Sequence, residues 1–380
     1  MERWIITALI AVQGFVFIPG IESAEKHDAY KAFIVTEAST GNILEGENTH
    51  LKRPPASITK LMVVYIVMEK LKRGELKLSD NVIVSGKASK MGGTQVYLKE
   101  GEVFTLEEML KATLIASAND AAYAIAEFIS GSVAEFVDLM NQNAKALNMT
   151  DTTYNFVHGL PPSKGKQEDI SSCHDLSILA RQLLKHPKIL EWTATQRESF
   201  RDGKFIMYNS NKLLAKMPSV DGLKTGYYRE AGYSVVATAK RGDLRLIVVV
   251  LGSPRARIRN NLAVEKFKKY FAQYTMVKVI KKGQVIDKEI FLPQGETTIL
   301  KGVASSEFLY PVAKERKKEL KTAINMPDKI DGEIKVGQKL GELNISFENN
   351  IIGKVDIVSP VAVPRAGIFT RSLRFFGLGN

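Results

Sequence analysis

The pattern of hydrophobic and polar residues predicts strands at the start of the chain and a buried helix after them. The short apolar run 32–35 ends at polar residues and a glycine, and 42–46 follows, which predicts a strand, a turn and a second strand. Pro54 and Pro55 then stop the extended chain and start a helix at Ser57. The apolar residues of this helix leave little polar face, so we expect it to be buried. They are Leu61, Met62, Val64, Tyr65, Val67 and Met68.

Further helices are predicted in the middle of the chain. Residues 106–116 and 121–129 both show helical spacing of apolar positions, and a short polar break separates them. Another helix is predicted over 175–184, with Ser171 or Ser172 as its N-terminal cap.

The pattern changes to extended segments after Lys224. Residues 233–238 and 244–251 are strand-like runs separated by a turn. They are predicted to be antiparallel neighbours, and the second is apolar enough to be buried on both faces. Helices between two groups of strands predict an α+β fold, with helices covering an antiparallel sheet, over residues 25–275. Shorter strand-like runs then predict a small all-β domain over 276–360.

The two ends of the chain carry further signals. Residues 1–24 combine Arg3, an apolar run over 4–18 and the small pair Ser23-Ala24, as an export signal peptide does. The apolar run is shorter than the roughly 20 residues that span a bilayer as a helix. Export is therefore expected.

The C-terminal tail, 361–380, is basic and contains regularly spaced apolar residues. Phe369, Leu373 and Phe376 share one face of a helix and the arginines lie away from it, as in a helix that lies in a membrane interface. The alternative is a frayed end of little consequence. We expect an amphipathic membrane-anchoring tail.

Charge and composition narrow the classes of partner. The 380-residue chain has a formal net charge of +12, which suggests an anionic neighbour, either nucleic acid or an acidic membrane surface. No nucleic-acid motif occurs, which favours the membrane. Cys173 is the sole cysteine, so an intrachain disulfide is excluded. The five histidines are far apart in sequence and form no His-Glu-x-x-His pattern, so no catalytic metal is expected.

Three short motifs carry the chemistry. They are Ser57-Ile-Thr-Lys60, Ser117-Ala-Asn119 and Lys224-Thr-Gly226, in that order. This set resembles the Ser-x-x-Lys, Ser-Asp-Asn and Lys-Thr-Gly set described for active-site serine enzymes that transfer acyl groups, with the departure that Ala118 is the middle residue of the second motif. Two similar strings are rejected: Ser163–Lys166 lies in a polar loop, and Ser79–Asn81 forms a turn before a short strand.

Each motif suits a step of acyl transfer. A serine hydroxyl such as that of Ser57 needs a base, and Lys60, one helical turn later, can serve only if its pKa falls several units from about 10.4. Burial and a second cation, Lys224, both lower that pKa. Ser117 is placed to pass a proton to the leaving amine, and Asn119 to bind a substrate amide.

The third motif suits recognition of a carboxylate. The charge of Lys224 and the hydroxyl of Thr225 can hold a substrate carboxylate. Gly226 is expected to leave room for substrate backbone against the strand edge.

At these residues the chain resembles the low-molecular-mass penicillin-binding proteins, specifically the D-alanyl-D-alanine carboxypeptidases. The resemblance extends through 54–60, His158-Gly-Leu160, Ser171-Ser-x-x-Asp175 and 224–227, and covers nearly everything after the signal. It implies a penicillin-recognising transpeptidase-like fold, followed by a small β domain and an amphipathic anchor. It also implies a peripheral location on the periplasmic face of the cytoplasmic membrane and no cofactor.

By this resemblance Ser57 attacks the carbonyl of the penultimate D-alanine of a peptidoglycan stem peptide, and Lys60 takes its proton. Ser117 relays a proton to the departing D-alanine. The backbone N–H groups of Ser57 and Tyr227 hold the oxyanion, and Arg259 supports carboxylate recognition. β-Lactam antibiotics are expected to be covalent inhibitors.

Competing readings differ in substrate or in activity. A class A β-lactamase would need a Glu-x-x-x-Asn pattern between Ser117 and Lys224, and none occurs. An endopeptidase that cuts D-alanyl crosslinks uses the same residues and stays open. A non-catalytic cell-wall binding protein is disfavoured by the intact motifs. His158 and Cys173 are expected to be structural rather than catalytic.

Overall fold

A five-stranded antiparallel sheet joins the two groups of strands predicted for the first domain. The computed structural model describes residues 29–163, 165 and 167–368, so the predicted signal peptide lies outside the described residues. The strands of the sheet are β1 (Ala32–Glu37), β2 (Ile43–Glu47), β7 (Val220–Tyr228), β8 (Gly232–Arg241) and β9 (Leu244–Ser253). Their order, β2-β1-β9-β8-β7, places the N-terminal hairpin beside the last strand in sequence. Strand β7, which carries the Lys-Thr-Gly motif, is therefore an edge strand.

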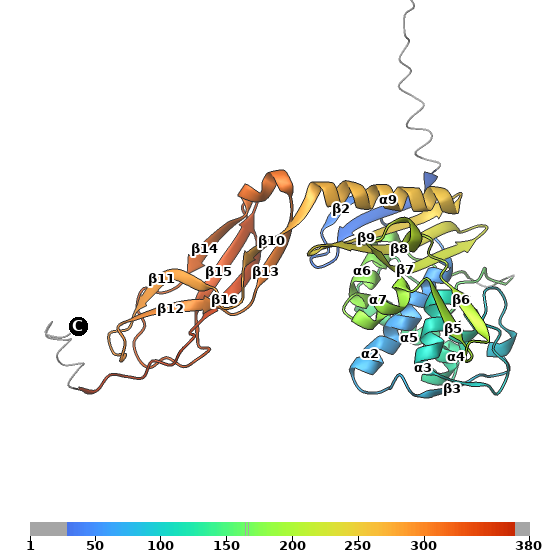
Figure 1. Ribbon diagram of the computed structural model, residues 1–380, viewed down its shortest axis with the longest axis horizontal. Helices are drawn as coiled ribbons and strands as arrows, with labels where there is room; N and C mark the ends of the chain where they lie inside the picture. The colour runs from blue at the N-terminus through green and yellow to red at the C-terminus, as the bar shows by residue number, and fades with distance from the viewer. Residues whose placement is uncertain (1–28, 164, 166, 369–380) are drawn as a thin grey trace, which may run out of the picture.

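Both faces of this sheet are buried, which confirms the prediction for 244–251. Val248 of β9 packs on one face with Phe267 of helix α9 (Ala256–Gln273). Val249 packs on the other face, in the same core as helices α2 (Lys60–Lys72) and α6 (Cys173–Leu183). Successive strand residues point to opposite faces, so a continuous apolar run suits a strand covered twice. Figure 1 shows α9 along one side of the sheet and helices α2 and α6 on the opposite side.

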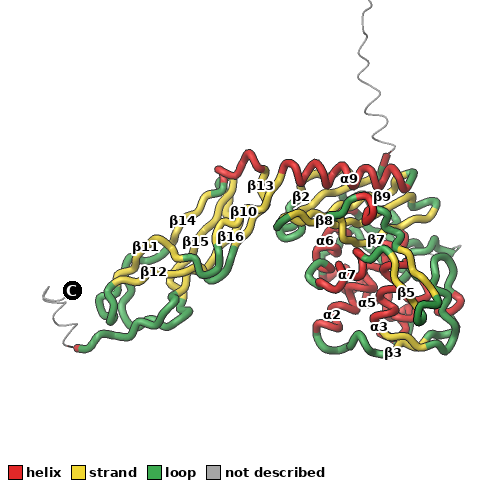
Figure 2. The backbone as a smooth tube through the Cα atoms, in the orientation of Figure 1, coloured by secondary structure: helices red, strands yellow, loops and turns green. Residues whose placement is uncertain are grey.

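The other helices and short strands of this domain complete a helical lobe and its margins (Figure 2). The helices are η1 (Ala56–Thr59), η2 (Ala88–Lys90), α3 (Leu106–Lys111), η3 (Ala112–Ala116), α4 (Asn119–Ser130), α5 (Val133–Ala146), α7 (Pro187–Ala194) and α8 (Leu213–Lys216). Two hairpins pair β3 (Asn81–Ile83) with β4 (Val103–Thr105), and β5 (Arg197–Phe200) with β6 (Phe205–Tyr208).

The predicted helices are confirmed, with one local difference. The segment 106–116 is not one continuous α-helix, because α3 ends at Lys111 and 112–116 form the π-helical turn η3. The wider turn is closed by a bond from Ala118 N to Ala112 O at 3.1 Å, and it leads into Ser117. Ser172 is the cap of α6, since its Oγ accepts a bond from Asp175 N at 3.2 Å.

The C-terminal domain is all β. A five-stranded sheet of order β11-β12-β16-β15-β14 encloses its own core, with Ile290, Leu343 and Ile357 among the buried residues. A separate pair, β10 with β13, leads into it from α9. The strands are β10 (Tyr274–Ile280), β11 (Val285–Phe291), β12 (Ile299–Ala304), β13 (Phe308–Ala313), β14 (Lys321–Asn325), β15 (Lys339–Phe347) and β16 (Asn350–Val358), with the short helix η4 (Lys314–Glu319).

The β domain continues beyond the expected end at residue 360. Val363 is buried and pairs with Ile334, and Ala366 N donates to Gln294 O at 2.8 Å. The first residues of the expected tail, 361–366, thus belong to this domain because they complete its core. The apolar positions at Phe369, Leu373 and Phe376 lie outside the described residues.

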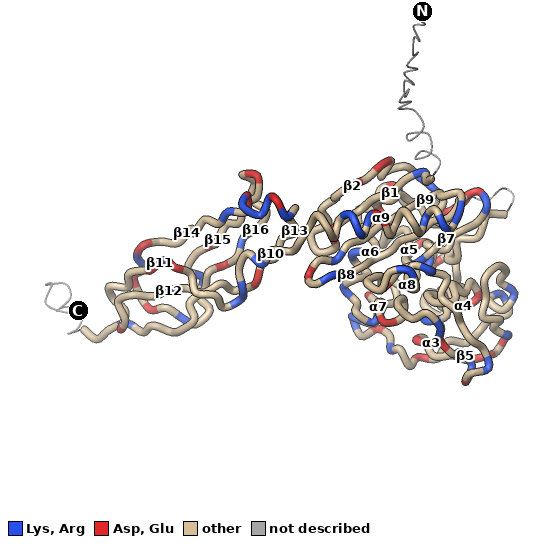
Figure 3. Tube along the Cα trace, turned by 45° about the horizontal axis from the view of Figure 1, so that its top comes forward, with Lys and Arg blue, Asp and Glu red and all other residues tan. Residues whose placement is uncertain are grey.

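The two domains lie end to end. Figure 1 shows the β domain extending from the end of α9, away from the helical lobe. Asn42 Nδ2 bonds Tyr310 Oη at 3.1 Å across the junction. Lys and Arg residues are spread over both domains (Figure 3). Within the described part of the chain, no helix combines the length and apolar character that crossing a membrane requires.

Candidate active site

Ser57 and Lys60 meet at the start of the buried helix, as their spacing predicts. Ser57 lies in the 3-10 turn η1 and Lys60 is the first residue of α2. Lys60 Nζ lies 3.1 Å from Ser57 Oγ and donates a second bond to His158 O at 2.7 Å. The lysine is therefore fixed against the hydroxyl from which it would take a proton.

The turn that presents Ser57 is held by a close backbone approach. Ala56 has a φ of 52°, in the left-handed region that an alanine rarely adopts. Gly159 faces it, and a Cβ on Gly159 would lie 2.0 Å from Ala56 O. Only glycine lets the 158–160 segment pack this closely, and that segment supplies the carbonyl that bonds Lys60.

Lys60 is placed to act as a base. Its side chain is fully buried, and burial, reinforced by the charge of Lys224, lowers the pKa of Lys60 well below its usual value. Two buried carboxylates, Asp169 and Asp120, oppose this by favouring the charged form. Burial is the largest of these effects, and it favours the neutral amine that a base requires.

Ser117 and Lys224 form the second pair of the site, although 107 residues separate them in sequence. Lys224 Nζ donates to Ser117 Oγ at 2.8 Å and to Thr225 O at 3.1 Å. Ser117 has left-handed backbone angles, φ 64° and ψ 30°, between the turn η3 and helix α4. This conformation turns the hydroxyl out of the helix and toward strand β7.

Lys224 is itself perturbed. Burial, together with the nearby Arg259 guanidinium, lowers the pKa of Lys224 to about 7. Arg259 is buried behind the strand and bonds Asn260 Oδ1 and the carbonyl of Ser234. Arg259 therefore affects the site through its charge, which lowers the pKa of Lys224. The described hydrogen bonds of its guanidinium are to other groups of the protein.

Asn119 presents an unpartnered oxygen. Its Nδ2 donates to Gly92 O at 2.7 Å, which fixes the orientation of the amide. Its Oδ1 is buried and has no hydrogen-bond partner. A buried acceptor without a partner is costly, so this oxygen is suited to accept an N–H from a bound substrate.

The remaining residues of the third motif lie on the edge strand beside this pair. Thr225 Oγ1 bonds Ser210 Oγ at 2.8 Å. Ser210 was not expected at the site, because no motif marks it. The ring of Tyr227 is about half exposed and stacks on Tyr233, with centroids 4.0 Å apart.

The reason for glycine at position 226 differs from the one expected. A Cβ there would lie 2.4 Å from Pro55 O and 3.2 Å from Ala56 Cβ. The space that Gly226 leaves open is taken by the protein's own turn before Ser57 rather than by substrate. The glycine therefore lets the edge strand pack against the nucleophile turn.

Asp169 is a site residue that sequence reasoning missed. It is buried and accepts bonds from Thr59 Oγ1 at 2.8 Å and from the backbone N–H groups of Asn155 and Phe156 at 2.7 and 2.9 Å. Burial raises its pKa to about 6, against these bonds. Through Thr59, Asp169 ties the turn η1, directly before helix α2, to the loop that delivers His158 O to Lys60. A single aspartate in a loop carries no sequence signal of this role.

His158 and Cys173 make contacts that suit the structural roles expected of them. His158 Nδ1 accepts from Leu160 N at 3.0 Å, and burial, with the charge of Lys60, lowers the pKa of His158 to about 4. Cys173 is fully buried at the start of α6, and burial raises the pKa of its thiol. Of the rejected strings, Ser79–Asn81 lies in a turn in which Asp80 accepts a bond from Lys77 N.

These contacts bring the three motifs together on the helical lobe and the edge of the sheet. Comparison with known proteins agrees with this arrangement. A family model described as D-alanyl-D-alanine carboxypeptidase matches residues 20–255, and a model of the penicillin-binding protein 5 C-terminal domain matches 274–365. The chain belongs to the D-alanyl-D-alanine carboxypeptidase family, within the low-molecular-mass penicillin-binding proteins, and has their transpeptidase-like fold.

Individual relatives match over nearly the whole chain. The D-alanyl-D-alanine carboxypeptidase DacF of Bacillus subtilis is 34% identical over 99% of this chain and 98% of its own length. The crystal structure of PBP3, a peptidoglycan synthesis regulatory factor of Streptococcus pneumoniae, superposes with a TM-score of 0.76 at 28% identity, covering 88% of this chain and 99% of that one. Penicillin-binding protein D2 of Listeria monocytogenes, in an ampicillin-bound form, has a TM-score of 0.57 and 30% identity over 63% of this chain and 96% of its own.

Proposed function

We propose that this protein is a serine-type D-alanyl-D-alanine carboxypeptidase that removes the terminal D-alanine from peptidoglycan stem pentapeptides through an acyl-enzyme on Ser57. The observation that carries the proposal is the buried Lys60 amine at 3.1 Å from the Ser57 hydroxyl, with Lys224 and Ser117 paired beside it. The names of the relatives support the same reaction.

Acylation begins when neutral Lys60 takes the Ser57 proton. The Ser57 oxygen attacks the carbonyl of the penultimate D-alanine, and the backbone N–H groups of Ser57 and Tyr227 stabilise the oxyanion. The terminal carboxylate binds to Lys224 and Thr225, and Asn119 Oδ1 accepts an amide N–H of the substrate. A bound carboxylate favours the protonated form of Lys224.

The leaving group needs a proton. Ser117 Oγ, bonded to Lys224 Nζ at 2.8 Å, donates it to the amine of the departing D-alanine as the C–N bond breaks. Ser117 recovers its hydroxyl proton from Lys60, which holds the proton taken from Ser57, so Lys60 becomes neutral again. Water then attacks the ester carbonyl, and neutral Lys60 accepts a proton from that water. As the ester C–O bond breaks, Lys60 returns this proton to Ser57 Oγ, and the shortened peptide leaves with a free carboxyl group. β-Lactams acylate Ser57 by the same first step, and the ampicillin-bound relative supports this.

Release of free D-alanine from a stem pentapeptide tests the reaction. The unaltered protein should release one D-alanine per peptide, and Ser57→Ala should abolish release. Ser163→Ala is the matched control, because Ser163 begins the second Ser-x-x-Lys string in an exposed loop. An equal loss of D-alanine release in both variants, or D-alanine release that persists in Ser57→Ala, would contradict the proposal.

Crosslinked dimers of the same peptide test the endopeptidase alternative. We expect D-alanine release to be faster than dimer cleavage. A protein that cleaves dimers but releases no terminal D-alanine is an endopeptidase, whereas a folded protein with neither activity fits the non-catalytic wall-binding alternative.

We further propose that the protein is exported and lies on the periplasmic face of the cytoplasmic membrane, held by its basic C-terminal tail. The support is the sequence of 1–24 and of the tail. Because Val363 and Ala366 belong to the β domain, the truncation that tests this should end at Gly367. Loss of sedimentation with vesicles rich in anionic lipid is expected, and undiminished sedimentation would contradict the proposal.

A further inference from the structure

Two histidines and an aspartate, far apart in sequence, meet on the helical lobe. His50 follows strand β2, Asp151 follows helix α5, and His174 lies in the first turn of α6. One ligand atom from each lies within 4.8 Å of the other two. His50 Nδ1 is 2.7 Å from Asp151 Oδ2, and the rings of His50 and His174 have centroids 4.4 Å apart.

A buried carboxylate organises this group from behind. Asp175 Oδ1 lies 3.1 Å from His174 Nδ1, which leaves Nε2 as the free ring nitrogen of His174. Asp175 Oδ2 accepts bonds from Asp151 N and Thr152 Oγ1, both at 2.8 Å. Histidine ligands of metals usually donate their second nitrogen to a carboxylate in this way.

We propose that His50, Asp151 and His174 bind one divalent cation of the zinc type. Two imidazoles and a carboxylate are common ligands of Zn²⁺, with water in the fourth position. Tetrahedral bonds of about 2.0–2.2 Å to the ion would set the ligand atoms roughly 3.3–3.6 Å apart. The His50–Asp151 pair, at 2.7 Å, would therefore have to open, and separations of up to 4.8 Å would have to close. The side chain of His50 is 61% exposed, so it can move to make this adjustment.

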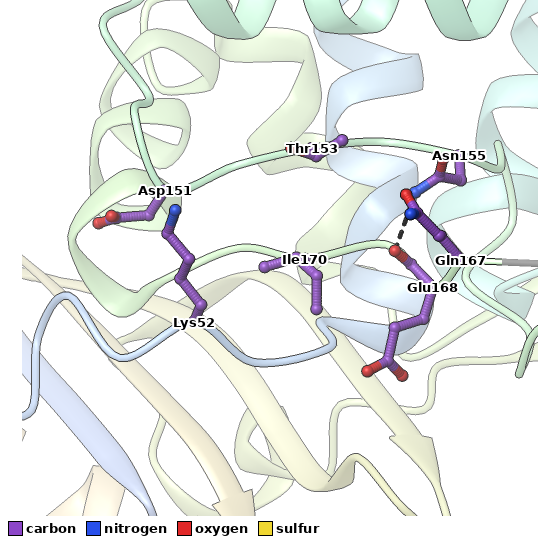
Figure 4. Close-up of a pocket in the computed structure, with 7 residues that line it drawn as sticks. All are labelled: Lys52, Asp151, Thr153, Asn155, Gln167, Glu168 and Ile170. Atoms are coloured by element: carbon purple, nitrogen blue, oxygen red, sulfur yellow. Dashed lines mark hydrogen bonds between the residues drawn. The ribbon is translucent and has the colours of Figure 1, made fainter.

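An open pocket adjoins the group at Asp151. The pocket, of about 450 Å³, is lined by Asp151 and Lys52 among other residues, and Figure 4 shows the Lys52 side chain extending toward Asp151. The ammonium group opposes the charge of a cation at Asp151. We therefore expect removal of the Lys52 charge to tighten binding.

The ion would link two segments of the chain and would take no part in catalysis. His174 N donates to Thr49 O at 2.9 Å, and Arg53 N donates to Ser171 O at 2.8 Å. The segment before the nucleophile turn is thus already attached to the start of α6, and the cation adds a cross-link at the same place. Sequence spacing hid this group, because the two histidines approach only in the fold.

The proposal is tested by titrating the EDTA-treated full-length protein with Zn²⁺ in a calorimeter, and by measuring its melting temperature with and without zinc. We expect one ion per chain and a higher melting temperature with zinc. His50→Gln and His174→Gln should each weaken binding at least about tenfold, the lower end of the loss seen when a partner behind a metal ligand is removed. Lys52→Gln should strengthen it.

His186→Gln is the matched control, since His186 Nε2 bonds Glu69 at 3.0 Å in a histidine–carboxylate pair outside this group. It should leave zinc affinity unchanged. Zinc affinity that is equal in the unaltered protein and His50→Gln, or that falls equally in His186→Gln, would overturn the proposal. The exposed position of His50 keeps that comparison informative even if His174→Gln fails to fold.

Discussion

Lys60 and Lys224 have opposite requirements for their protons. Lys60 must be neutral to accept the Ser57 proton, whereas Lys224 must be charged to hold a carboxylate. For the free enzyme, kcat/KM should therefore rise as Lys60 deprotonates and fall as the pH passes the lowered pKa of Lys224, about 7. The measurement is kcat/KM for the pentapeptide across pH. A profile that stays flat above pH 8 would show that carboxylate binding does not depend on this charge.

A substitution at Arg259 tests whether the fall of kcat/KM at high pH, the falling limb of the profile, reports the deprotonation of Lys224. Arg259→Gln removes a positive charge that helps to lower the pKa of Lys224, so the limb should move to higher pH. Arg257→Gln, at an exposed neighbouring position, should leave it in place. Thermal melting must first show that the Arg259 variant is folded, because its guanidinium is buried and bonded. An unmoved limb in folded protein would assign it to another group.

Asp169 has two roles that substitutions can separate: its charge raises the pKa of Lys60, and its oxygens accept buried hydrogen bonds. Asp169→Asn keeps an oxygen for the N–H groups of Asn155 and Phe156 but removes a charge that raises the pKa of Lys60. The rising limb should then shift to lower pH with the fold intact. Asp169→Ala leaves those buried donors unpaired, at about 1–3 kcal/mol each. It should lower both the melting temperature and the acylation rate by penicillin. Identical behaviour of the two variants would argue against a role for the charge.

The nucleophile turn depends on a loop that must come very close to it. Gly159→Ala places a Cβ 2.0 Å from Ala56 O at a φ of +70°, so the backbone must move away from Ser57. Gly203→Ala, with a φ of +83° and nothing within 4 Å, carries the strain without the clash. The control should lose about 1–2 kcal/mol of stability. Gly159→Ala should lose more, together with most penicillin acylation; equal losses would show that the close approach is unimportant.

Elements whose partners are close in sequence could be predicted, and contacts between distant segments could not. The helical turn alone sets Lys60 beside Ser57, and the apolar run in β9 predicts a strand buried on both faces. Nothing in the sequence reveals that Asp169 bonds Thr59, or that Pro55 fills the space left by Gly226. The meeting of Lys224 with Ser117 was expected only through the resemblance. Helix propensity likewise gives no sign that the helix ends at Lys111 in a π-turn.

The two domains have separate hydrophobic cores, so the first domain is expected to fold without the second. Core residues of the sheet and lobe are distinct from those of the β domain, although Tyr274 and Met276 of β10 pack against the first domain. A protein ending at Met276 should fold and be acylated by penicillin within about twofold of the full-length rate. The Listeria relative, which aligns with 63% of this chain, supports a catalytic domain that stands alone. Failure of the truncated protein to fold would show that the β domain is required for folding.

The end-to-end arrangement of the domains has a consequence for where the enzyme can work. The last described residues, near 368, lie at the end of the β domain remote from the first domain (Figure 1). An enzyme tethered there is held at a stand-off from its attachment point by the length of a domain. With the tether proposed above, the enzyme would trim peptides within a layer of wall set by that distance, and peptides nearer the attachment point or beyond the layer would escape it. Shortening or lengthening the β domain would move that layer and leave the chemistry unchanged.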